Sequence, residues 1–410
     1  MRDTVAEQVN DASDMVELRD YAEALEKAAR DFRITLGEAG LRDAWLKVQN
    51  KPAVKQSLVS LATTLEDLIA ALKTAAERAR GLEQCYERAQ NIMPRLKAFL
   101  SIVKTAEDDP PEENKGESIL WYETYPKSFM LHATPIDVAS IFQAHTDNFS
   151  SSWIFTSATL QVNKKFTHFA NNIGLENYQS GVWDSPFNYQ QQSLLYLPEN
   201  LPQPAEPAYT EQLMKAAIPV LHASQGRAFV LFTSYYAMYK ARDYLKRMLP
   251  YELLVQGDFP KHQLLEKFRQ ADNAILLGTS SFWEGVDVRG ESLSCVIIDK
   301  LPFASPGDPV MQARIDAIKQ NGGQPFMEFQ VPQAVITLKQ GVGRLIRDVN
   351  DTGVLMIGDP RLKQKSYGRI FLNSLPSMPV TSDVKDVENF FSSLPAISSA
   401  DSRVSELGYL

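Results

Sequence analysis

The spacing of apolar residues predicts that the first quarter of the chain is helical. In the run from Ser57 to Arg78, leucines stand at positions 58, 61, 65, 68 and 72, three or four residues apart. That period places them on one face of a helix, and the run contains neither glycine nor proline. A polar, proline-containing connector follows from about residue 108. We therefore predict a bundle or long antiparallel hairpin of helices over residues 1–116.

Between residues 117 and 192 the apolar residues fall in short runs that are typical of strands. The runs 118–124 and 128–134 are rich in aromatic residues. The run 152–160 predicts a buried strand that stops in small hydroxyl residues. In an α/β sheet, ligands lie at the carboxyl end of such a strand. A strand followed by an ordinary Ser/Thr turn explains the same pattern.

From about residue 193, strands and helices alternate. The apolar runs predict strands at 227–234, 252–256, 274–281, 294–300 and 353–359, and helices at 209–224, 236–249, 261–269 and up to Gln340. This alternation predicts a parallel sheet that is covered by helices on both faces. Three strands end in polar residues, at Thr233, Thr279 and Asp299, and we expect these to collect along one edge. The serine-rich residues 391–410 predict a flexible tail.

Composition and charge indicate an ordinary globular chain of two or three domains. It has 410 residues, of which 44% are hydrophobic and 22% charged. The net charge of −8 implies that any contact with nucleic acid is made by a local groove with its own positive lining. No signal peptide and no run of eighteen apolar residues occurs, so we expect a cytoplasmic protein without membrane contact.

The sequence lacks the residues for two common kinds of cofactor site, a cysteine-based metal site and a phosphate-binding loop. The two cysteines, Cys85 and Cys295, are far apart, so neither a disulfide framework nor an iron–sulfur or zinc site is predicted. Isolated cysteines are usually small core residues. The phosphate-binding loop Gly-x-x-x-x-Gly-Lys-Ser/Thr is also absent from these residues.

The strongest chemical signal is the segment Gln340-Gly-Val-Gly343-Arg344-Leu-Ile-Arg347. If it is helical, the amide of Gln340 and both guanidinium groups lie near one face. A guanidinium is always charged and planar, which suits the negative charge that spreads over a γ-phosphate during transfer. The two glycines weaken a helix by roughly 1 kcal/mol each, which predicts a close approach of a ligand or another backbone. A solvated helix end is the ordinary explanation of two such arginines alone.

Four segments together resemble motifs III to VI of the superfamily 2 helicases, in order and in spacing. They are Thr156-Ser-Ala-Thr-Leu160, Phe232-Thr-Ser-Tyr235, Gly278-Thr-Ser-Ser-Phe-Trp-Glu-Gly-Val-Asp287 and the Gln340–Arg347 segment. The Trp-Glu-Gly-Val-Asp form of motif V, Ser185-Pro-Phe-Asn-Tyr189 and Leu301-Pro-Phe-Ala-Ser-Pro306 resemble the XPD/DinG branch, and most of all the bacterial paralogues of DinG. The family's Walker A loop, four-cysteine iron–sulfur insertion and Asp-Glu-Ala-His box are not encoded here.

This resemblance implies a fold of RecA-like parallel sheets of the P-loop NTPase type, with a helical domain at the amino terminus. Residues 1–116 correspond to the all-α Arch domain, and residues 117–192 to part of the first motor domain, with motif III. Residues 193–390 correspond to a complete second motor domain with motifs IV, V and VI, and residues 391–410 to the tail.

The resemblance also implies a site for ATP with Mg²⁺. Gln340 would sense the γ-phosphate, and Arg344 and Arg347 would reach it as arginine fingers. Further residues would lie at the nucleotide cleft or couple hydrolysis to strand movement: Gly343, Glu284 and Asp287 in the cleft, and Ser157, Ala158 and Thr159 in the coupling motif.

Single-stranded DNA is the implied substrate, bound through phosphates and through bases stacked on aromatic rings. The candidate residues are Thr233, Ser234, Tyr235, Thr279, Ser280, Ser281, Phe282 and Trp283. Core packing explains Phe282 and Trp283 equally well, because large aromatic residues are commonly buried. The resemblance further implies that the chi subunit of the replicative DNA polymerase is a partner.

Two hypotheses of function follow from the sequence. The first is the later portion of an ATP-dependent 5′–3′ DNA helicase that acts in DNA repair and couples hydrolysis to translocation on single-stranded DNA. The second is a truncated, non-enzymatic module that binds single-stranded DNA or a replication partner protein. The missing phosphate-binding loop favours the second for these 410 residues by themselves.

Overall fold

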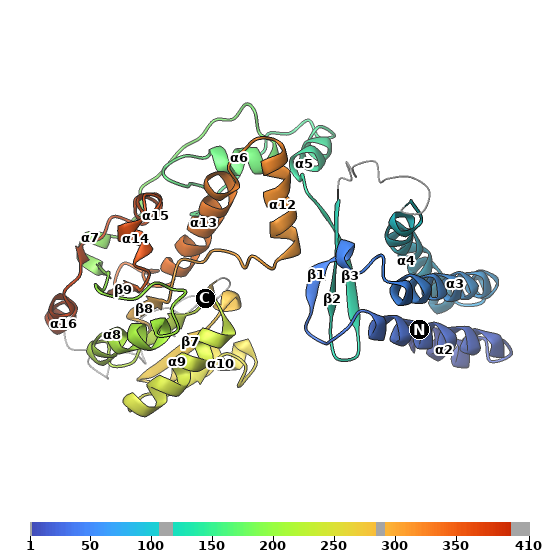
Figure 1. The fold of residues 1–410 in the computed structure, drawn as a ribbon, viewed down its shortest axis with the longest axis horizontal. Helices are drawn as coiled ribbons and strands as arrows, with labels where there is room; N and C mark the ends of the chain where they lie inside the picture. The colour runs from blue at the N-terminus through green and yellow to red at the C-terminus, as the bar shows by residue number, and fades with distance from the viewer. Residues whose placement is uncertain (1, 106–117, 284–291, 395–410) are drawn as a thin grey trace, which may run out of the picture. The chain divides into compact units, whose positions relative to one another are not determined.

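The computed structural model describes residues 2–105, 118–283 and 292–394, which fall into two compact units (Figure 1). The first unit comprises the chain up to residue 141 together with residues 305–323. The second comprises residues 142–304 and the chain from residue 324 onward. These limits differ from the boundaries expected at residues 116 and 192, because packing groups the segments differently from the motif order.

The first unit combines four long helices with a small antiparallel sheet. The helices are α1 (Arg2–Asp11), α2 (Val16–Thr35), α3 (Pro52–Ala75) and α4 (Arg80–Thr105). The sheet has the order β1 (Arg42–Ala44), β2 (Ser118–Thr124) and β3 (Phe129–Pro135). Two short 3₁₀ turns, Trp45–Lys47 and Ala76–Arg78, and helix α12 (Pro309–Gln320), which packs on β1 and β2, complete it.

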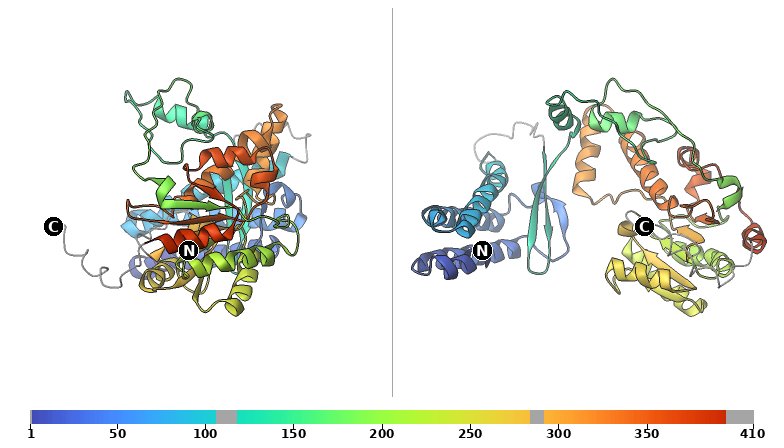
Figure 2. Two further views of the ribbon diagram at one scale, coloured as in Figure 1. Left: turned by 90° about the vertical axis from the view of Figure 1, so that its left-hand side faces the viewer. Right: turned by 180° about the vertical axis from the view of Figure 1, so that it is seen from behind.

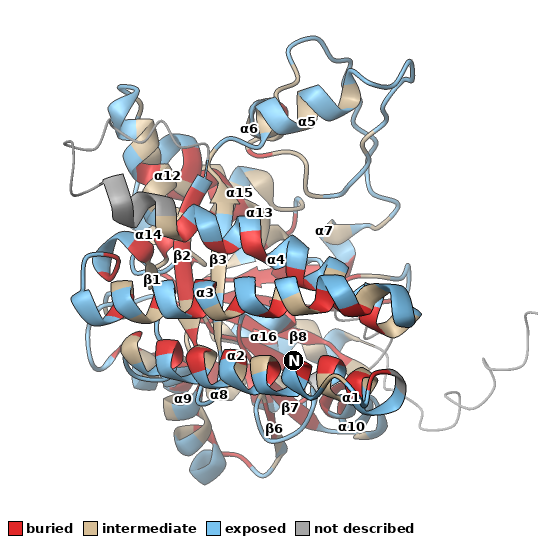
Figure 3. Cartoon of the chain, turned by 90° about the vertical axis from the view of Figure 1, so that its right-hand side faces the viewer, coloured by how far each residue is buried: buried red, intermediate tan, exposed pale blue. Residues whose placement is uncertain are grey.

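The core of this unit explains why β2 and β3 belong with the helices. Buried and exposed positions alternate with the helical period along α2 and α3, and the buried ones face a shared core (Figure 3). Tyr122 is part of that core, and Phe129 and Leu131 pack against it. The expectation of helices alone up to residue 116 was wrong at β1, whose residues pair with β2.

The part of the chain from residue 136 to 192 forms no sheet. It contains α5 (Ala139–Thr146), α6 (Thr167–Ile173) and α7 (Tyr189–Gln192). The strand predicted at 152–160 was wrong: residues 152–157 have no regular structure, and Ile154 is 86% exposed. No strand among the described residues pairs with this run, so its backbone has no ladder to join.

The second unit contains a seven-stranded parallel sheet of order β10-β4-β9-β8-β5-β7-β6. The strands are β4 (Ser193–Tyr196), β5 (Ala228–Leu231), β6 (Glu252–Val255), β7 (Ala274–Gly278), β8 (Cys295–Ile298), β9 (Gly353–Ile357) and β10 (Val380–Thr381). Five of them begin within two residues of their predicted positions. Strands β4 and β10 were missed, because they are only four and two residues long.

Helices cover both faces of this sheet, so the predicted α/β class with a parallel sheet is confirmed (Figure 2). One face packs on α8 (Tyr209–Ala223), α9 (Tyr235–Met248) and α16 (Val384–Ser393). The other packs on α10 (Lys261–Gln270), α11 (Ser280–Trp283), α13 (Val331–Val342), α14 (Arg361–Gln364) and α15 (Gly368–Ser374). A π-helical turn, Phe326–Gln330, leads into α13.

The side chains of each strand alternate between the two layers. On β5, Phe229 and Leu231 face the α13 side, and Ala228 and Val230 face the α8 side. Both cysteines are free and buried, as expected of small core residues. In the described ranges, no helix has the length and apolar character needed to cross a membrane.

Candidate functional site

Polar residues meet where the central strands of the seven-stranded sheet end. Strand β5 lies between β7 and β8, so Thr233, Thr279 and Asp299 follow three neighbouring strands. The carboxylate of Asp299 accepts hydrogen bonds from the backbone nitrogen of Thr233 at 3.1 Å and from its hydroxyl at 3.3 Å. The expectation that these residues collect along one edge is therefore confirmed for β5 and β8 by direct contact.

Two buried carboxylates hold the loops at this edge. Asp299 is 1% exposed and also accepts the backbone N–H of Lys300 at 2.7 Å. Burial raises its pKa to about 6, although the nearby Lys300 ammonium and the hydrogen bonds lower it. Asp359, after β9, accepts the N–H of Leu301 at 2.8 Å and forms an ion pair with Arg361. The ion pair with Asp359 thus fixes the position of the Arg361 side chain.

Gln256 links three of the predicted DNA-binding residues. Its amide oxygen accepts the backbone N–H of Thr279 at 2.6 Å, and its amide nitrogen donates to the hydroxyls of Tyr235 at 2.7 Å and Ser281 at 3.0 Å. The motif comparison missed this residue, because it lies outside every motif. It does follow β6 directly, as Thr233 follows close after β5, and that position was the available signal.

The indole of Trp283 joins three motifs. Its Nε1 donates to the carbonyl of Phe232 in motif IV at 3.3 Å. Its own carbonyl accepts Nε of Arg344, in motif VI, at 3.1 Å and Nη2 at 2.8 Å. A Cβ atom on Gly341 would lie 2.8 Å from Cε3 of Trp283, so the glycine permits this close packing. The expected close approach at this glycine is thus made by a side chain from motif V.

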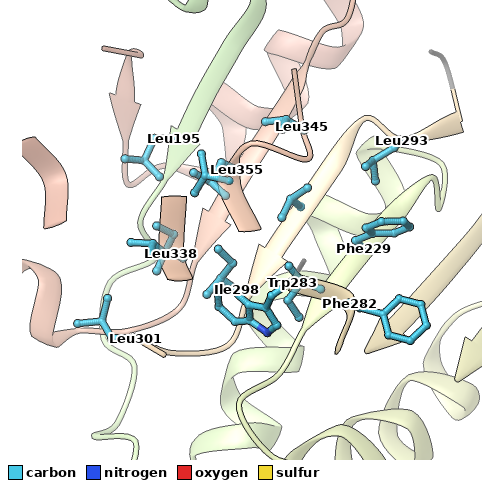
Figure 4. Packing of buried hydrophobic residues seen from close by; sticks show 14 of the residues in the cluster. Leu195, Phe229, Phe282, Trp283, Leu293, Ile298, Leu301, Leu338, Leu345 and Leu355 are labelled. Atoms are coloured by element: carbon cyan, nitrogen blue, oxygen red, sulfur yellow. The ribbon is translucent and has the colours of Figure 1, made fainter. Parts of the chain in front are cut away.

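The expectation that Phe282 and Trp283 stack on DNA bases requires correction. They are 1% and 2% exposed, and Figure 4 shows Trp283 beside Ile298 in the apolar core. The Phe282 ring packs on Gly278, where a Cβ atom would lie 2.7 Å from Cγ of Phe282. Bases cannot reach rings buried in this way, so core packing is the role that these two residues have here.

The predicted helical face of motif VI was wrong beyond Gln340. Helix α13 ends at Val342, and the chain turns at Gly343 before Arg344 and Arg347. Two causes lie in the following residues. Leu345 and Ile346 are buried in the core, which draws the chain inward. The carboxylate of Asp351 accepts the backbone N–H groups of Arg347 at 2.8 Å and Asp348 at 2.9 Å.

The side chain of Gln340 remains on α13, one turn before this bend. Its Oε1 atom is buried and has no hydrogen-bond partner among the described residues. The half-buried guanidinium groups of Arg344 and Arg347 suit the terminal phosphate of a nucleotide in charge. A phosphate oxygen could accept only from the amide nitrogen of Gln340, because the Oε1 atom is itself an acceptor. No cluster of three or more metal-binding side chains occurs in the part of the chain that is described.

The residues of motif III form an exposed turn. The hydroxyl of Ser157 accepts the backbone N–H of Thr159 at 3.1 Å and lies 3.1 Å from its hydroxyl, and Ala158 is exposed between them. Just beyond, the carbonyl of Gln161 accepts Nζ of Lys339 at 3.1 Å, and Val162 is buried in the core. Burial lowers the pKa of Lys339. Motif III is therefore fastened to α13 next to Gln340.

The remaining predicted site residues divide into two groups. Ser234 caps α9 by accepting the N–H of Ala237 at 3.3 Å, and Ser280 is exposed at the start of α11. Glu284 and Asp287 lie outside the described residues. The hydroxyl groups after β5 and β7 are thus linked through Gln256, and Arg344 is linked to motif IV through Trp283.

Comparison with known proteins identifies relatives over most of the chain. Residues 218–378 match the family model of a helicase C-terminal domain. The ATP-dependent DNA helicase YoaA of Haemophilus influenzae is 42% identical over 378 residues, which are 92% of this chain and 57% of that protein. YoaA of Escherichia coli is 42% identical over 377 residues, with 92% and 58% covered.

The chain thus spans little more than half the length of these curated relatives. Among solved structures, apo XPD has a TM-score of 0.56 to this chain, covering 88% of it and 69% of the XPD chain. At 17% sequence identity, that likeness bears on the fold alone.

Proposed function

Because this chain belongs to the XPD/DinG-type superfamily 2 helicases, we propose that it provides the second motor lobe and the helical domain of an ATP-dependent DNA helicase. The observation that carries the proposal is the joining of motifs IV, V and VI through Trp283 at the edge of a parallel sheet. In this proposal the helicase moves 5′–3′ on single-stranded DNA and acts in DNA repair and replication. Action on chromosomal DNA would place it in the cytoplasm.

In the proposed mechanism, this lobe supplies charge to ATP bound with Mg²⁺. Arg344 and Arg347 stabilise the negative charge of the γ-phosphate, and Gln340 contacts its oxygen atoms. By the motif resemblance, Gly343, Glu284 and Asp287 would line the same cleft. Since the arginines and the phosphate-binding loop would belong to different lobes, hydrolysis depends on lobe closure.

DNA would bind along the neighbouring hydroxyl groups. Thr233, Ser234, Thr279, Ser280 and Ser281 would contact phosphate oxygens, and Tyr235 would stack on a base. Gln256 supports this assignment, because it fixes three of these residues relative to one another. Trp283 holds the motifs together in this proposal and does not touch DNA.

Motif III would couple ATP hydrolysis mechanically to movement along the DNA strand. The bond from Lys339 to the carbonyl of Gln161 ties the Ser157–Thr159 turn to the helix that carries Gln340. A movement of that helix on hydrolysis would therefore be felt at motif III. The displacement would be transmitted through the hydrogen bond between Lys339 and Gln161.

A chimera tests the proposal directly. This chain would replace the matching part of Escherichia coli YoaA, and ATP turnover and duplex unwinding would be measured with single-stranded DNA present. We expect DNA-stimulated turnover that falls on the order of 10³-fold in Arg347→Ala. The same change at the exposed Arg369 should have no effect. A folded, DNA-binding chimera whose turnover survives Arg347→Ala would overturn the assignment.

The alternative, a non-enzymatic module, remains favoured for the 410 residues alone by the missing phosphate-binding loop. ATP turnover by the purified chain, with and without single-stranded DNA, distinguishes the two. Background turnover with retained DNA binding supports the module. DNA-stimulated turnover that Arg347→Ala abolishes would show that these residues hold a complete nucleotide site.

We also propose the chi subunit of the replicative DNA polymerase as a partner, with the contact on the second lobe and the tail. Co-purification of chi with the chain and with a form lacking residues 392–410 tests this placement. Equal recovery of chi with both forms would remove the tail from the contact, and no recovery with either would remove the partner.

A further inference from the structure

Three planar side chains form a row on the outer face of α9. Tyr235, Tyr239 and Arg242 stand four and three residues apart, so they share one side of the helix. The two tyrosine rings are stacked, with centroids 6.2 Å apart and planes at 29°. The Arg242 guanidinium carbon lies 5.0 Å from the centroid of the Tyr239 ring. Tyr235 is 51% exposed and Tyr239 is 37% exposed, so both rings are open to a ligand.

The surroundings hold this row in place. Gln256 donates to the Tyr235 hydroxyl at 2.7 Å. Gly257 has φ of +108°, and a Cβ atom there would lie 3.1 Å from the Tyr239 hydroxyl, so only glycine lets the backbone pass so close. The carboxylate of Asp243 accepts Nε of Arg242 at 2.8 Å. Side chains fixed in this way lose little conformational entropy when a ligand binds.

A second pair of the same chemistry joins the loop between β6 and α10, which carries Phe259, to α10 itself, which carries Lys267. Phe259 is 45% exposed, and Nζ of Lys267 lies 4.8 Å from its ring centroid. The backbone of Phe259 pairs with that of Gln256, the residue that holds Tyr235. Exposed rings and cations therefore recur side by side from α9 to α10.

Single exposed tyrosines are ordinary on a protein surface, but this arrangement has features that they lack. The rings are stacked on one another, each row ends in a cation, and neighbouring groups hold the rings in position. Because Asp243 forms an ion pair with Arg242 at 2.8 Å, the row on α9 offers planar faces for stacking rather than net positive charge, and the second cation is Lys267 beside Phe259. Stacking faces combined with cations are what single-stranded nucleic acid requires.

We propose that Tyr235, Tyr239, Arg242, Phe259 and Lys267 form a base-stacking platform for single-stranded DNA. The inference rests on the proposed function, in which the same DNA strand is bound by the hydroxyl groups that follow β5 and β7. We call these groups the hydroxyl edge: Thr233, Ser234, Thr279, Ser280 and Ser281. It extends that path beyond Thr279 and Ser281. Bases near Gln256 would stack on Tyr235 and Tyr239 along α9, and a neighbouring base would stack on Phe259 beside Lys267.

The test compares two fluorescent oligonucleotides of equal length, oligo(dT) and an abasic deoxyribose-phosphate chain, by anisotropy with the 410-residue protein. Tyr239→Leu should weaken binding of oligo(dT) roughly tenfold and leave the abasic chain unaffected, because only the first offers bases to stack. Tyr239→Phe should bind as the wild type does. Tyr178→Leu, at a tyrosine that is 42% exposed outside this surface, is the matched control. Circular dichroism confirms that each variant is folded.

The outcomes separate this platform from the hydroxyl edge. If the wild type binds oligo(dT) and Tyr239→Leu binds it equally well, the platform is overturned and the edge stands. If Ser281→Ala weakens both oligonucleotides alike while Tyr239→Leu weakens only oligo(dT), both proposals are supported. If the wild type binds neither oligonucleotide, both are overturned. Displacement of oligo(dT) by an acidic peptide, equally from the wild type and from Tyr239→Leu, would assign the cations to a protein ligand and overturn the platform.

Discussion

Two segments of the second unit share one pattern of residues and differ in structure. Residues 152–159 are Ser-Trp-Ile-Phe-Thr-Ser-Ala-Thr, and residues 274–281 are Ala-Ile-Leu-Leu-Gly-Thr-Ser-Ser. The second forms β7 between β5 and β6, with Ile275 fully buried. The first has no strand partner among the described residues, and its Ile154 is 86% exposed. An apolar run is therefore not sufficient for a strand, because the neighbouring backbone decides whether its polar groups can be paired.

The largest expected contrast is between the two tryptophans of these regions. Trp283→Ala should lower the free energy of unfolding by about 3–5 kcal/mol, because it removes a fully buried ring and two inter-motif contacts. Trp153→Ala, at a ring that is 46% exposed, should cost less than about 1.5 kcal/mol. Urea unfolding followed by circular dichroism measures both. Equal losses would mean that the 152–157 segment is packed as tightly as α11, the short helix that follows β7.

The next contrast concerns the buried carboxylate of Asp299 at the end of β8. The exposed segment 152–157 has no buried carboxylate of this kind. Burial raises the pKa of Asp299 from 3.8 to about 6, so the folded state holds the proton more tightly than the unfolded chain does. The stability contributed by this group is complete below pH 3.8 and is lost as the pH rises through 6. The loss amounts to about 3 kcal/mol at most.

Asp299→Asn should remove this dependence. The unfolding free energy of the variant minus that of the wild type should become more positive between pH 4 and pH 7. Urea titrations at several pH values provide the measurement. A difference that stays constant over this range would show that water reaches the carboxylate.

A smaller effect is expected at the glycine that faces the Trp283 ring. In Gly341→Ala the new Cβ atom would lie 2.8 Å from the indole, and relieving that overlap should cost about 1–3 kcal/mol. Gly307→Ala is the control, because Gly307 is exposed and the nearest atom to its added Cβ, Oγ of Ser305, is 3.9 Å away. Thermal unfolding of the two variants compares them. A Gly341→Ala protein as stable as the control would contradict the close contact.

The smallest effect on the free energy of unfolding is expected at Val162, where the exposed segment after residue 152 enters the core. Val162 is buried at 8% exposure, whereas Val182 is 66% exposed. Val162→Ala should cost about 1 kcal/mol and Val182→Ala less than about 0.5 kcal/mol. Denaturant unfolding of both variants resolves the difference. If the two changes cost the same, the anchor at Val162 is absent in solution.

The sheet of the second unit could be predicted because its strands carry their signal in their own residues. Strands β5, β7, β8 and β9 each have four or five consecutive apolar residues, as expected of strands covered on both faces. The strand order could not be predicted, since it depends on packing between residues far apart in the chain.

Residues of the candidate site could be predicted only where they belong to one of the helicase-like motifs. Thr233 and Thr279 could be placed at the sheet edge from sequence. The bend before Arg344 could not, because it depends on the burial of Leu345 and on the carboxylate of Asp351. Gln256 was missed because it lies outside every motif, and its partners are 21, 23 and 25 residues away in the chain.

The contact between Trp283 and Gly341 also bears on how such a protein can change over evolutionary time. A larger residue at 341 is tolerated only if the ring at 283 becomes smaller, and a smaller ring at 283 leaves a void that favours a larger residue at 341. We therefore expect the two positions to change as a pair, because a substitution that is harmful at one of them alone can be offset by a second substitution at the other. The contact would in this way couple the evolution of motif V to that of motif VI.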